Sequence, residues 1–361
     1  MLRILYAIQG TGNGHISRAQ AIIPLLKTLA HVDVLISGTE CQLDVPFPVA
    51  FRLKGLSFCA NKQGGIDYWK TFKKSKLREL YRDIQQLPVD DYDLVMNDFE
   101  PVSAWACQLK QVYCVGLSHQ AAVHHHKSPK PTSKDSLGDW VLGHYAPVHR
   151  AYGFHFDAYA KRIFTPVIRE EIRQSKLKNK GHYTIYLPAY NQAVIESVLQ
   201  KIPETTWHIF SKECTEPHQQ NNLHFFPINN PLFVRSFIES EGILCGAGFE
   251  TPAEALFMKK KLMVIPMKGQ YEQQCNAAAL KQLGVPVLKR LRKKHIPSLQ
   301  AWIGSEQAIA VDYPNETLAI LQHILAEYPY IIMRKKKPKE IGFNAWRKIL
   351  FNSETVEVLK G

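Results

Sequence analysis

Residues 4–29, ILYAIQGTGNGHISRAQAIIPLLKTL, form the unit that decides how the chain begins to fold. The apolar run at 4–8 predicts a buried strand, and from Ile16 onward apolar residues recur at helical spacing. Residues 9–15 then form the turn between them, where glycines permit positive φ and let a ligand approach the backbone. The N–H groups at the helix start favour an anion or a polar sugar. The same glycines would also suit a tight turn without a ligand, and the spacing does not match G-x-G-x-x-G.

The alternation of short apolar runs with amphipathic segments continues along the chain. Strands are expected at 4–8, 32–36, 49–53, 94–97, 112–116, 183–187, 207–210, 223–226, 242–245 and 262–266. Helices fall between them, and this rhythm indicates an α/β protein with parallel sheets. The rhythm breaks between 119 and 180, which divides the chain into two halves of similar size.

Length and cysteine usage favour a two-domain intracellular protein. A chain of 361 residues is long for one domain. No apolar stretch reaches the roughly 18 residues of a membrane-spanning helix. The seven cysteines include no C-x-x-C pair, so we expect reduced thiols and a cytoplasmic location. No His/Cys spacing typical of a metal site is present, and no metal is expected.

The net charge of +13 is concentrated in basic clusters. These clusters lie at 70–78, 259–261, 289–295 and 334–339. Such clusters favour an anionic surface such as acidic lipid headgroups or nucleic acid, although a single cluster is more often only solvated. No common nucleic-acid motif is present, so we expect no nucleic-acid partner and consider attachment to the inner face of a membrane.

The stretch 242–285, GILCGAGFETPAEALFMKKKLMVIPMKGQYEQQCNAAALKQLGV, holds a second strand-turn-helix unit. Thr251 as N-cap with Glu254 three residues later predicts a capping box, which explains Glu254 without a ligand. A small-residue turn that leads into a helix N-terminus is nevertheless also an anion site. The following polar loop and helix start carry side chains that suit a hydroxyl-rich ligand, namely Gln270, Glu272, Gln273, Gln274 and Asn276.

These segments resemble the GT-B glycosyltransferases, which include the UDP-glycosyltransferases and the lipid-linked N-acetylglucosaminyltransferase of peptidoglycan synthesis. The stretch 242–285 is similar to their nucleotide-sugar half, and GTGNGHISRA is similar to their G-x-G-H loop. TPVIREEI at 165–172 is similar to their N-P-V-R segment. A bacterial and archaeal branch of glycosyltransferase-like proteins shares G-x-G-H-x-S-R-A and the D-F-E-P found here at 98–101.

The resemblance implies an α/β fold of two facing Rossmann-like domains. Residues 1–160 would form the acceptor-binding domain, 166–335 the nucleotide-sugar-binding domain, and 336–361 a helix that packs back. The implied reaction is inverting transfer of a hexosyl group from a nucleotide-diphosphate sugar, expected to be a UDP-sugar, to an acceptor hydroxyl. The acceptor could be lipid-linked. Neither a metal nor a cofactor is required in this reading.

The resemblance also implies roles for individual residues. His15 would deprotonate the acceptor, Asp98 would orient it, and Glu254 would hold the ribose. The loop Gly12, Asn13 and Gly14 would face the phosphates and the sugar, and the peptide at 225–230 would read the base. The remaining donor contacts would come from Arg169, Gly248, Phe249, Glu250, Thr251, Glu272 and Gln273.

The sequence departs from the family pattern and leaves several alternatives open. Leu244 and Cys245 stand where the plant enzymes have a histidine, and Glu272 replaces the usual aspartate. Asp98 or Glu100 could be the base instead of His15. The D-x-D motif at 91–93 precedes its strand, so we interpret it as a solvated turn.

Other readings of function and of the acceptor side stay open at this point. His119 and His124 could line an acceptor pocket, or they could be surface histidines of a loop. A nucleotide-sugar 2-epimerase or hydrolase would use the same scaffold. A non-catalytic protein that binds nucleotide sugars or a membrane surface is the third reading.

Overall fold

The computed structural model describes residues 1–11, 13–38, 45–56, 77–133, 135–306, 308–328, 342–344 and 346. Its first half is built on a seven-stranded sheet in the order β3-β2-β1-β4-β5-β6-β7, in which every pair of strands is parallel. The strands are β1 (Arg3–Gln9), β2 (His31–Ser37), β3 (Phe51–Leu53), β4 (Leu94–Asp98), β5 (Cys114–Ser118), β6 (Arg150–Phe154) and β7 (Ile163–Phe164).

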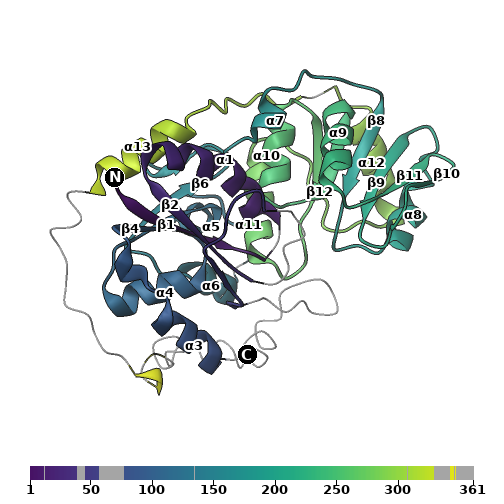
Figure 1. Ribbon diagram of the computed structural model, residues 1–361. Helices are drawn as coiled ribbons and strands as arrows, with labels where there is room; N and C mark the ends of the chain where they lie inside the picture. The colour runs from purple at the N-terminus through teal and green to yellow at the C-terminus, as the bar shows by residue number, and fades with distance from the viewer. Residues whose placement is uncertain are drawn as a thin grey trace.

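The second half is built on a six-stranded sheet in the order β10-β11-β9-β8-β12-β13. Only the pair β10 and β11 is antiparallel. The strands are β8 (His182–Tyr186), β9 (Thr206–Ser211), β10 (His218–Gln220), β11 (Leu223–Pro227), β12 (Gly242–Gly246) and β13 (Lys261–Ile265). The expected α/β class with two Rossmann-like sheets is confirmed (Figure 1).

Helices cover both sheets, which is why the central strands are continuous apolar runs without polar alternation. Every residue of β4 and β5 is buried. The helices of the first half are α1 (Asn13–Leu29), α3 (Leu77–Gln86), α4 (Pro101–Lys110), α5 (His119–His124) and α6 (Ser136–His144). Those that follow are α7 (Glu170–Arg173), α8 (Gln192–Leu199), α9 (Asn230–Glu239), α10 (Glu250–Phe257), α11 (Tyr271–Gln282), α12 (Ile296–Ile303) and α13 (Thr317–Ala326). None of the described helices is long and apolar enough to cross a membrane.

Each strand expected from the sequence is present, but the structure adds strands inside the region where the rhythm seemed to break. β6 and β7 extend the first sheet by parallel pairing with β5 and with each other. β6 carries Gly153, where a Cβ would meet the backbone nitrogen of Ala122 at 2.6 Å. This close approach to α5 requires a glycine in the strand, and that glycine weakens the strand pattern in the sequence.

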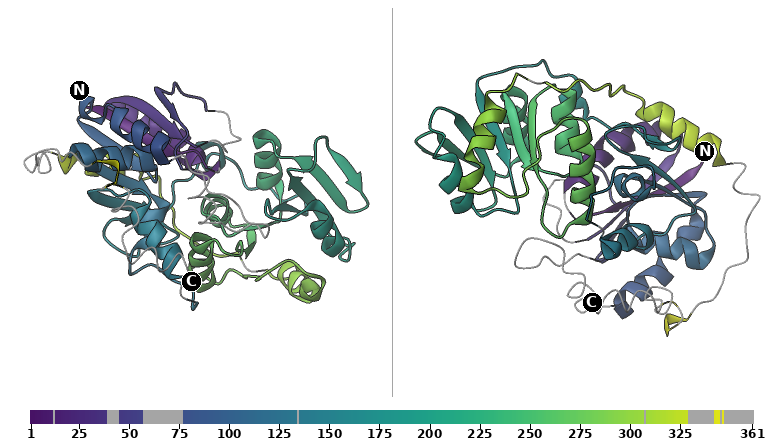
Figure 2. Two further views of the ribbon diagram at one scale, coloured as in Figure 1. Left: turned by 90° about the horizontal axis from the view of Figure 1, so that it is seen from below. Right: turned by 180° about the vertical axis from the view of Figure 1, so that it is seen from behind.

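The chain returns to the first half earlier than the range 336–361 expected for this crossing. α13 packs against α1, and both views in Figures 1 and 2 show it beside that helix. Glu327 accepts hydrogen bonds from Arg150 and from the Tyr152 hydroxyl, the latter at 2.6 Å. Further on, Trp346 is fully buried in the core of the first half. Residues 329–341 and 347–361 lie outside the described part of the chain.

The strand order of each sheet defines where a ligand binds. In the first sheet β1 lies between β2 and β4, and in the second sheet β8 lies between β9 and β12. Ligands of such sheets bind outside the carboxyl ends of the strands, at the point where the strand order reverses. These points are the turn after β1 with the end of β4, and the ends of β8 and β12. The residues that follow these strands therefore decide the site.

Candidate active site

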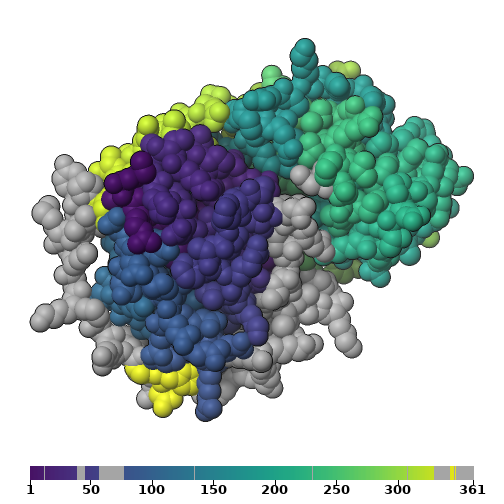
Figure 3. Space-filling view, viewed as in Figure 1, coloured from purple at the N-terminus to yellow at the C-terminus, as the bar shows by residue number. Residues whose placement is uncertain are grey.

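A cavity of about 470 Å³ lies between the two halves and is lined from both switch points. Figure 3 shows the halves in contact, the first in purple to blue and the second in teal to green. The first half lines the cavity with Thr11, Asn13, Gly14, His15, Ser17, Arg18, His119 and Gln120. Of the residues expected in the donor site, the second half contributes Arg169, Gly248, Phe249, Glu250, Thr251, Glu254, Glu272 and Gln273.

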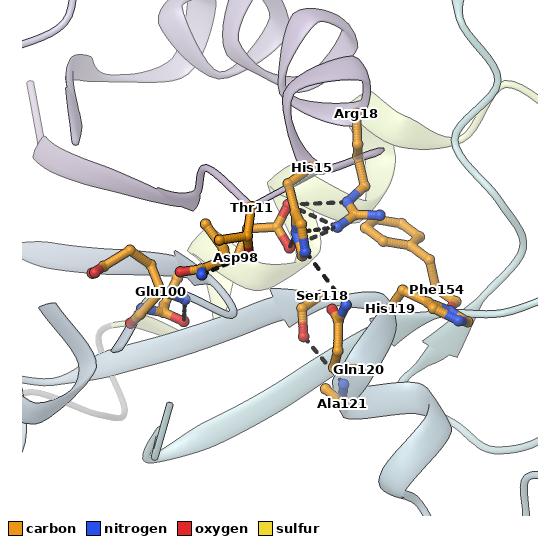
Figure 4. A network of polar contacts seen from close by, with 12 residues as sticks. Thr11, His15, Arg18, Asp98, Glu100, Ser118, His119, Gln120, Ala121 and Phe154 are labelled. Atoms are coloured by element: carbon orange, nitrogen blue, oxygen red, sulfur yellow. Dashed lines mark hydrogen bonds and ion pairs between the residues drawn. The ribbon is translucent and has the colours of Figure 1, made fainter. Parts of the chain in front are cut away.

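His15 and Asp98 form the polar pair that was expected from the sequence. His15 lies in the first turn of α1, and its Nδ1 is 2.9 Å from Oδ1 of Asp98 at the end of β4 (Figure 4). The Asp98 side chain is fully buried, whereas that of His15 is 11% exposed. Burial alone would raise the pKa of Asp98, but Arg18 and His15 lower it below its usual value. Asp98 is therefore an ionised acceptor next to an accessible imidazole.

Arg18 completes this pair and joins it to the second half. Its Nη2 lies 2.6 Å from Oδ1 of Asp98, and its Nη1 contacts Glu250 at the start of α10. Only 3% of Arg18 is exposed, so its charge requires these carboxylates. Burial raises the pKa of Glu250 to about 8, although Arg18 opposes the shift. A carboxyl that is readily protonated thus lies in the wall of the cavity.

The turn and the first residues of α10, which were expected to bind the diphosphate, line the cavity, but their capping differs from the prediction. α10 begins at Glu250 after Phe249, and no side chain makes an N-cap hydrogen bond. The expected capping box with Thr251 and Glu254 is therefore wrong. α10 begins one residue before Thr251, and no side chain caps its first N–H groups. Its first residues, Glu250 and Thr251, line the cavity.

Glu254 and Arg169, expected to hold ribose and phosphate, contact each other directly. Arg169 donates from Nε to Oε1 of Glu254 at 2.6 Å and from Nη2 to Oε2 at 2.8 Å. Glu254 is 2% exposed, and both residues line the cavity. A carboxylate has about four lone-pair sites, so this pairing leaves acceptor capacity for hydroxyl groups. The burial of Glu254 is explained by Arg169, not by helix capping.

The segment expected to read the sugar contacts the first half through α5. Gln120 donates from Nε2 to Oε2 of Glu272 at 3.0 Å. Nε2 of His119 donates to Oδ1 of Asn276 at 2.8 Å, and the His119 ring stacks on Phe249 at 3.9 Å. Asn276 is not at the start of its helix, since α11 begins at Tyr271. Side chains expected to read the sugar thus also hold the halves together.

The peptide expected to read the base also reaches the cavity. Ile228 and Asn229, within the expected segment 225–230, line it together with Tyr186, Phe210 and Phe233. Phe233 lies 5.2 Å from Phe210 and 5.4 Å from Tyr186, centre to centre. This end of the cavity is therefore aromatic, opposite the charged end around Arg18.

Two glycines of the opening turn are required by close packing. A Cβ on Gly10 would meet the carbonyl oxygen of Ser37 at 2.9 Å, and one on Gly14 would meet Cγ of Glu250 at 3.3 Å. The first contact lies within the first sheet and the second lies between the halves. The sequence interpretation credited the glycines to closure over a ligand, and Gly10 shows that part of the reason is internal. Gly12 lies outside the described residues.

Several alternative residues lie away from the cavity. Glu100 caps α4 by accepting from Val102 N at 2.7 Å and Ser103 N at 2.6 Å, and it is fully buried. It does not line the cavity, so its geometry does not suit a base. Phe99 between Asp98 and Glu100 has a φ of 58°, and this left-handed residue turns the two carboxylates to different sides.

Other candidates have ordinary surroundings. His124 is exposed and pairs with Asp139 at 3.3 Å. The D-x-D at 91–93 precedes β4, as expected, and Asp93 accepts from Arg3 N at 2.8 Å. Among the described residues no group of His, Cys, Asp and Glu has the arrangement of a metal site.

Arg18 and Gln120 are two polar cavity residues, each bonded to the second half, that the sequence analysis missed. Arg18 follows His15 by three residues, so both lie on one face of α1. An arginine among the buried residues of an apolar helix is a usable signal, because a buried charge needs a partner. In the sequence, only the place of Gln120 shortly after β5 indicates that it could line the cavity.

Comparison with known proteins agrees with this architecture. The family described as Glycosyl transferase family 1 matches residues 2–301. Among solved structures, Acinetobacter baumannii MurG is similar with a TM-score of 0.54 and 13% identity over 91% of this chain and 100% of that chain. S. aureus MnaA in complex with UDP has a TM-score of 0.58 and 11% identity over 95% and 100%. Arabidopsis thaliana UGT89C1 in complex with quercetin has a TM-score of 0.56 and 10% identity over 99% of each chain.

At these identities the structures support the fold alone, which is that of the GT-B glycosyltransferases. A search by sequence among curated proteins gives no significant match. The family match covers most of the chain and both switch points. The chain is a glycosyltransferase and belongs to glycosyl transferase family 1.

Proposed function

We propose that the protein transfers a hexosyl group from a UDP-sugar to a hydroxyl group of a glycosyl acceptor, with inversion. The observation that carries the proposal is the position of His15. Its imidazole pairs with a buried, ionised Asp98 and lines the same cavity as the N-terminus of α10 and Arg169. A base thus faces a site suited to a leaving diphosphate across one cavity.

The tautomer of His15 follows from its neighbours. Asp98 accepts a hydrogen bond from Nδ1 of His15, so Nδ1 carries the proton. Nη2 of Arg18 also lies 3.2 Å from this nitrogen. The amide nitrogen of Gln120, a donor, lies 3.4 Å from His15 Nε2. Nε2 is therefore the unprotonated nitrogen, and its lone pair has only this long contact with Gln120. This is the arrangement of a general base oriented by a carboxylate.

In the proposed reaction Nε2 of His15 takes the proton of the acceptor hydroxyl. The oxygen then attacks the anomeric carbon, and the bond from this carbon to the diphosphate oxygen breaks. A single displacement of this kind inverts the anomeric centre. The N–H groups at the start of α10 and the guanidinium of Arg169 stabilise the charge on UDP.

UDP as the nucleotide rests on the resemblance of the donor segment and on neighbouring structures. MnaA is described with UDP, and Phytolacca americana UGT2, with a TM-score of 0.55 and 10% identity, is described with UDP-2fluoro-glucose. In this chain Glu254 would hold the ribose, Glu272 or Gln273 the sugar, and the loop 12–14 would face the phosphates. The test is UDP release from a panel of UDP-sugars, with and without lipid extract. Release that needs no glycosyl acceptor would favour hydrolysis or epimerisation.

We also propose that the acceptor is presented at an anionic membrane surface. The cluster 334–339 and residues 70–76 of the cluster 70–78 lie outside the described residues. The cluster 259–261 is engaged internally, because Lys260 is buried and Lys261 pairs with Glu241 at 2.6 Å. The cluster 289–295 lies within the described residues and is the proposed docking surface. Its exposed cations are Lys289, Arg290, Arg292, Lys293 and Lys294.

Sedimentation with vesicles tests this docking. Each basic residue near an anionic surface contributes about 1 kcal/mol, so binding should require acidic lipid and weaken in high salt. Charge reversal of Lys293 and Lys294 should weaken docking while UDP affinity is unchanged. Equal binding to neutral and acidic vesicles, or none to either, would contradict a membrane-bound acceptor.

A further inference from the structure

Arg18 is a buried cation whose partners come from both halves of the chain. It follows His15 by three residues on α1, and its side chain is 2% exposed. Burial opposes its charge, while Asp98 and Glu250 hold the pKa of Arg18 above its usual value. A buried guanidinium needs acceptors for its charge and for its N–H groups. One carboxylate from each half meets this need, so the position of each depends on Arg18.

One edge of the guanidinium holds the carboxylate of Asp98 by both oxygens. Nε and Nη2 of Arg18 donate to Oδ2 at 3.2 and 2.8 Å, and Nη2 also lies 2.6 Å from Oδ1 (Figure 4). Oδ1 is the oxygen that accepts from Nδ1 of His15 at 2.9 Å. A planar fork that bonds both oxygens opposes rotation of the carboxylate, which a single point charge does not. Oδ1 therefore stays directed at the His15 ring.

The orientation of the guanidinium depends in turn on the second half. The hydrogen bond of Nη1 goes to Oε1 of Glu250 on α10. Cζ of Arg18 lies over the ring of the fully buried Phe154, 6.0 Å from its centre (Figure 4). Asp98, Phe154 and Glu250 thus bound the guanidinium on three sides while the halves are in contact. Without Glu250, Nη1 loses this bond and the guanidinium can turn away from Asp98.

The other titratable groups around the His15–Asp98 pair do not replace this cation. Burial raises the pKa of the Tyr6 hydroxyl on β1 well above its usual value, so Tyr6 is neutral. Burial lowers the pKa of His119 on α5, which disfavours a cation there. Glu272 on α11 is an acid. Arg18 is therefore the permanent cation among the groups that face the pair.

We propose that Arg18 is a positioning residue for the base, and that Glu250 makes this role depend on contact between the halves. Arg18 keeps the carboxylate of Asp98 ionised and directed at Nδ1 of His15, and Glu250 keeps the guanidinium in the orientation that allows this. The inference rests on the proposed transfer reaction and adds the residue that sets the state of its base. The base is then complete only when the donor-binding half is in place.

Proton uptake by the His15–Asp98 pair tests the role of Arg18 without turnover. NMR of protein labelled with nitrogen-15 histidine follows the His15 ring as the pH is changed, and His15→Gln identifies its signals. Removing a neighbouring cation favours protonation of the pair, so the midpoint should rise by at least about one pH unit in Arg18→Met. Arg18→Lys keeps a charge and should reverse about half of this shift. An unchanged midpoint in Arg18→Met would overturn the proposal.

The pH profile of turnover separates positioning from a purely structural role. In Arg18→Met the rate of UDP release at saturating donor should fall about 10²-fold near pH 7, and the acid limb of the profile should move upward with the NMR midpoint. A rate that falls equally at every pH would mean that Arg18 only supports the fold. Arg150→Met is the matched control, because Arg150 pairs with Glu327 and lines neither cavity. It should change neither the rate nor the profile.

Glu250→Ala tests the dependence on the second half and replaces Arg18→Met if that variant folds poorly. Turnover should fall about tenfold, the loss expected for a charged hydrogen bond, whereas Glu250→Gln keeps an acceptor for Nη1 and should stay within about threefold of the original. In the Arg18→Met background, Glu250→Ala should add little, since the contact is already lost. Losses that multiply would show that Glu250 does not act through Arg18 and would refute the dependence on the second half.

The two kinds of measurement distinguish this inference from the transfer reaction. A raised midpoint in Arg18→Met, together with no transfer by the original protein, would refute the proposed function while the control of His15 by Arg18 stands. Transfer that requires His15, together with a midpoint and a pH profile of Arg18→Met that match the original, would refute the positioning role while the transfer reaction stands.

Discussion

At the residue scale, the chemistry depends on how buried charges are balanced around His15. Asp98 is fully buried, and burial opposes its ionisation. Arg18 restores the ionised form, while burial works against its own charge as well. The two residues stabilise each other, and His15 receives an ionised, fully buried partner. Glu250 is the fourth member of this network. Its pKa is raised to about 8, so it is protonated more readily than Asp98.

We predict that His15→Ala lowers turnover by about 10²–10⁴-fold, the usual contribution of a general base. UDP affinity should stay within twofold of the original, because none of the contacts expected for UDP uses the His15 side chain. Steady-state UDP release and calorimetry measure the two quantities. His124→Ala changes an exposed histidine of the same half and serves as the control. A loss of UDP affinity equal to the loss of turnover would make His15 a binding residue.

The raised pKa of Glu250 predicts that UDP binding depends on pH. Its pKa is raised to about 8, so it is mostly neutral below that pH and becomes a carboxylate above it. A carboxylate at the start of α10 repels the diphosphate, so UDP affinity should fall about fivefold between about pH 7 and about pH 9, corresponding to roughly 1 kcal/mol. Glu250→Gln should remove this dependence. Calorimetry should also show proton uptake on binding near pH 8 for the original chain but not for the variant.

At the scale of elements, the sequence predicted the features that depend on neighbouring residues and missed those that depend on contacts between distant residues. The apolar runs located the strands because a buried parallel strand is apolar on both faces. β6 and β7 escaped notice because Gly153 and the short β7 give no such run. The capping box around Thr251 was wrong because Glu254 has a stronger partner in Arg169, 85 residues away in sequence. Likewise, nothing near His15 in sequence indicates that Arg18 reaches Glu250.

The second sheet carries a row of imidazoles that predicts an acid-sensitive stability. His182 and His208 stack at 3.8 Å, His224 lies 5.3 Å from His208, and the Ser236 hydroxyl contacts the first two. Burial, then His182 and His224, lower the pKa of His208 to about 3, while Glu239 acts in the other direction. Lys260 and Lys180 further oppose a charge on His182. The folded chain therefore keeps His208 neutral.

The sign of the effect follows from proton uptake. The unfolded chain protonates His208 near its ordinary pKa of about 6.5, and the folded chain does so only near pH 3. The free energy of unfolding should thus be highest above about pH 6.5 and should fall as the pH drops toward about 3. Urea unfolding at several pH values measures this slope. His208→Gln should flatten it, whereas His31→Gln, an exposed histidine, should leave it unchanged.

At the scale of the whole molecule, several polar side-chain contacts join the two halves at the site. Arg18 contacts Glu250, Gln120 contacts Glu272, and His119 contacts Asn276. The same elements carry the residues proposed as the base and as donor contacts. Closure of the halves is therefore coupled to assembly of the proposed site, which the linear sequence could not show because each pair joins residues far apart in the chain.

This coupling predicts the effect of breaking the contact between His119 and Asn276. His119→Ala removes a 2.8 Å hydrogen bond and the stack on Phe249, together worth about 1–2 kcal/mol of closure, so turnover should fall about tenfold. Small-angle scattering of the UDP-bound protein should report a larger radius of gyration. His144→Ala, an exposed histidine that stacks on Trp140 within the first half, should change neither.

A double-mutant cycle distinguishes closure from a direct effect of His119 on the substrate. Asn276→Ala removes the same hydrogen bond from the other half, where Asn276 also holds the carbonyl oxygen of Ala247 at 3.1 Å. If the bond acts by joining the halves, the second substitution adds little to the first, since the contact is already lost. Losses that multiply would mean that the two residues act separately. In that case closure would depend on the charged contact between Arg18 and Glu250, and the scattering of His119→Ala would match that of the original protein.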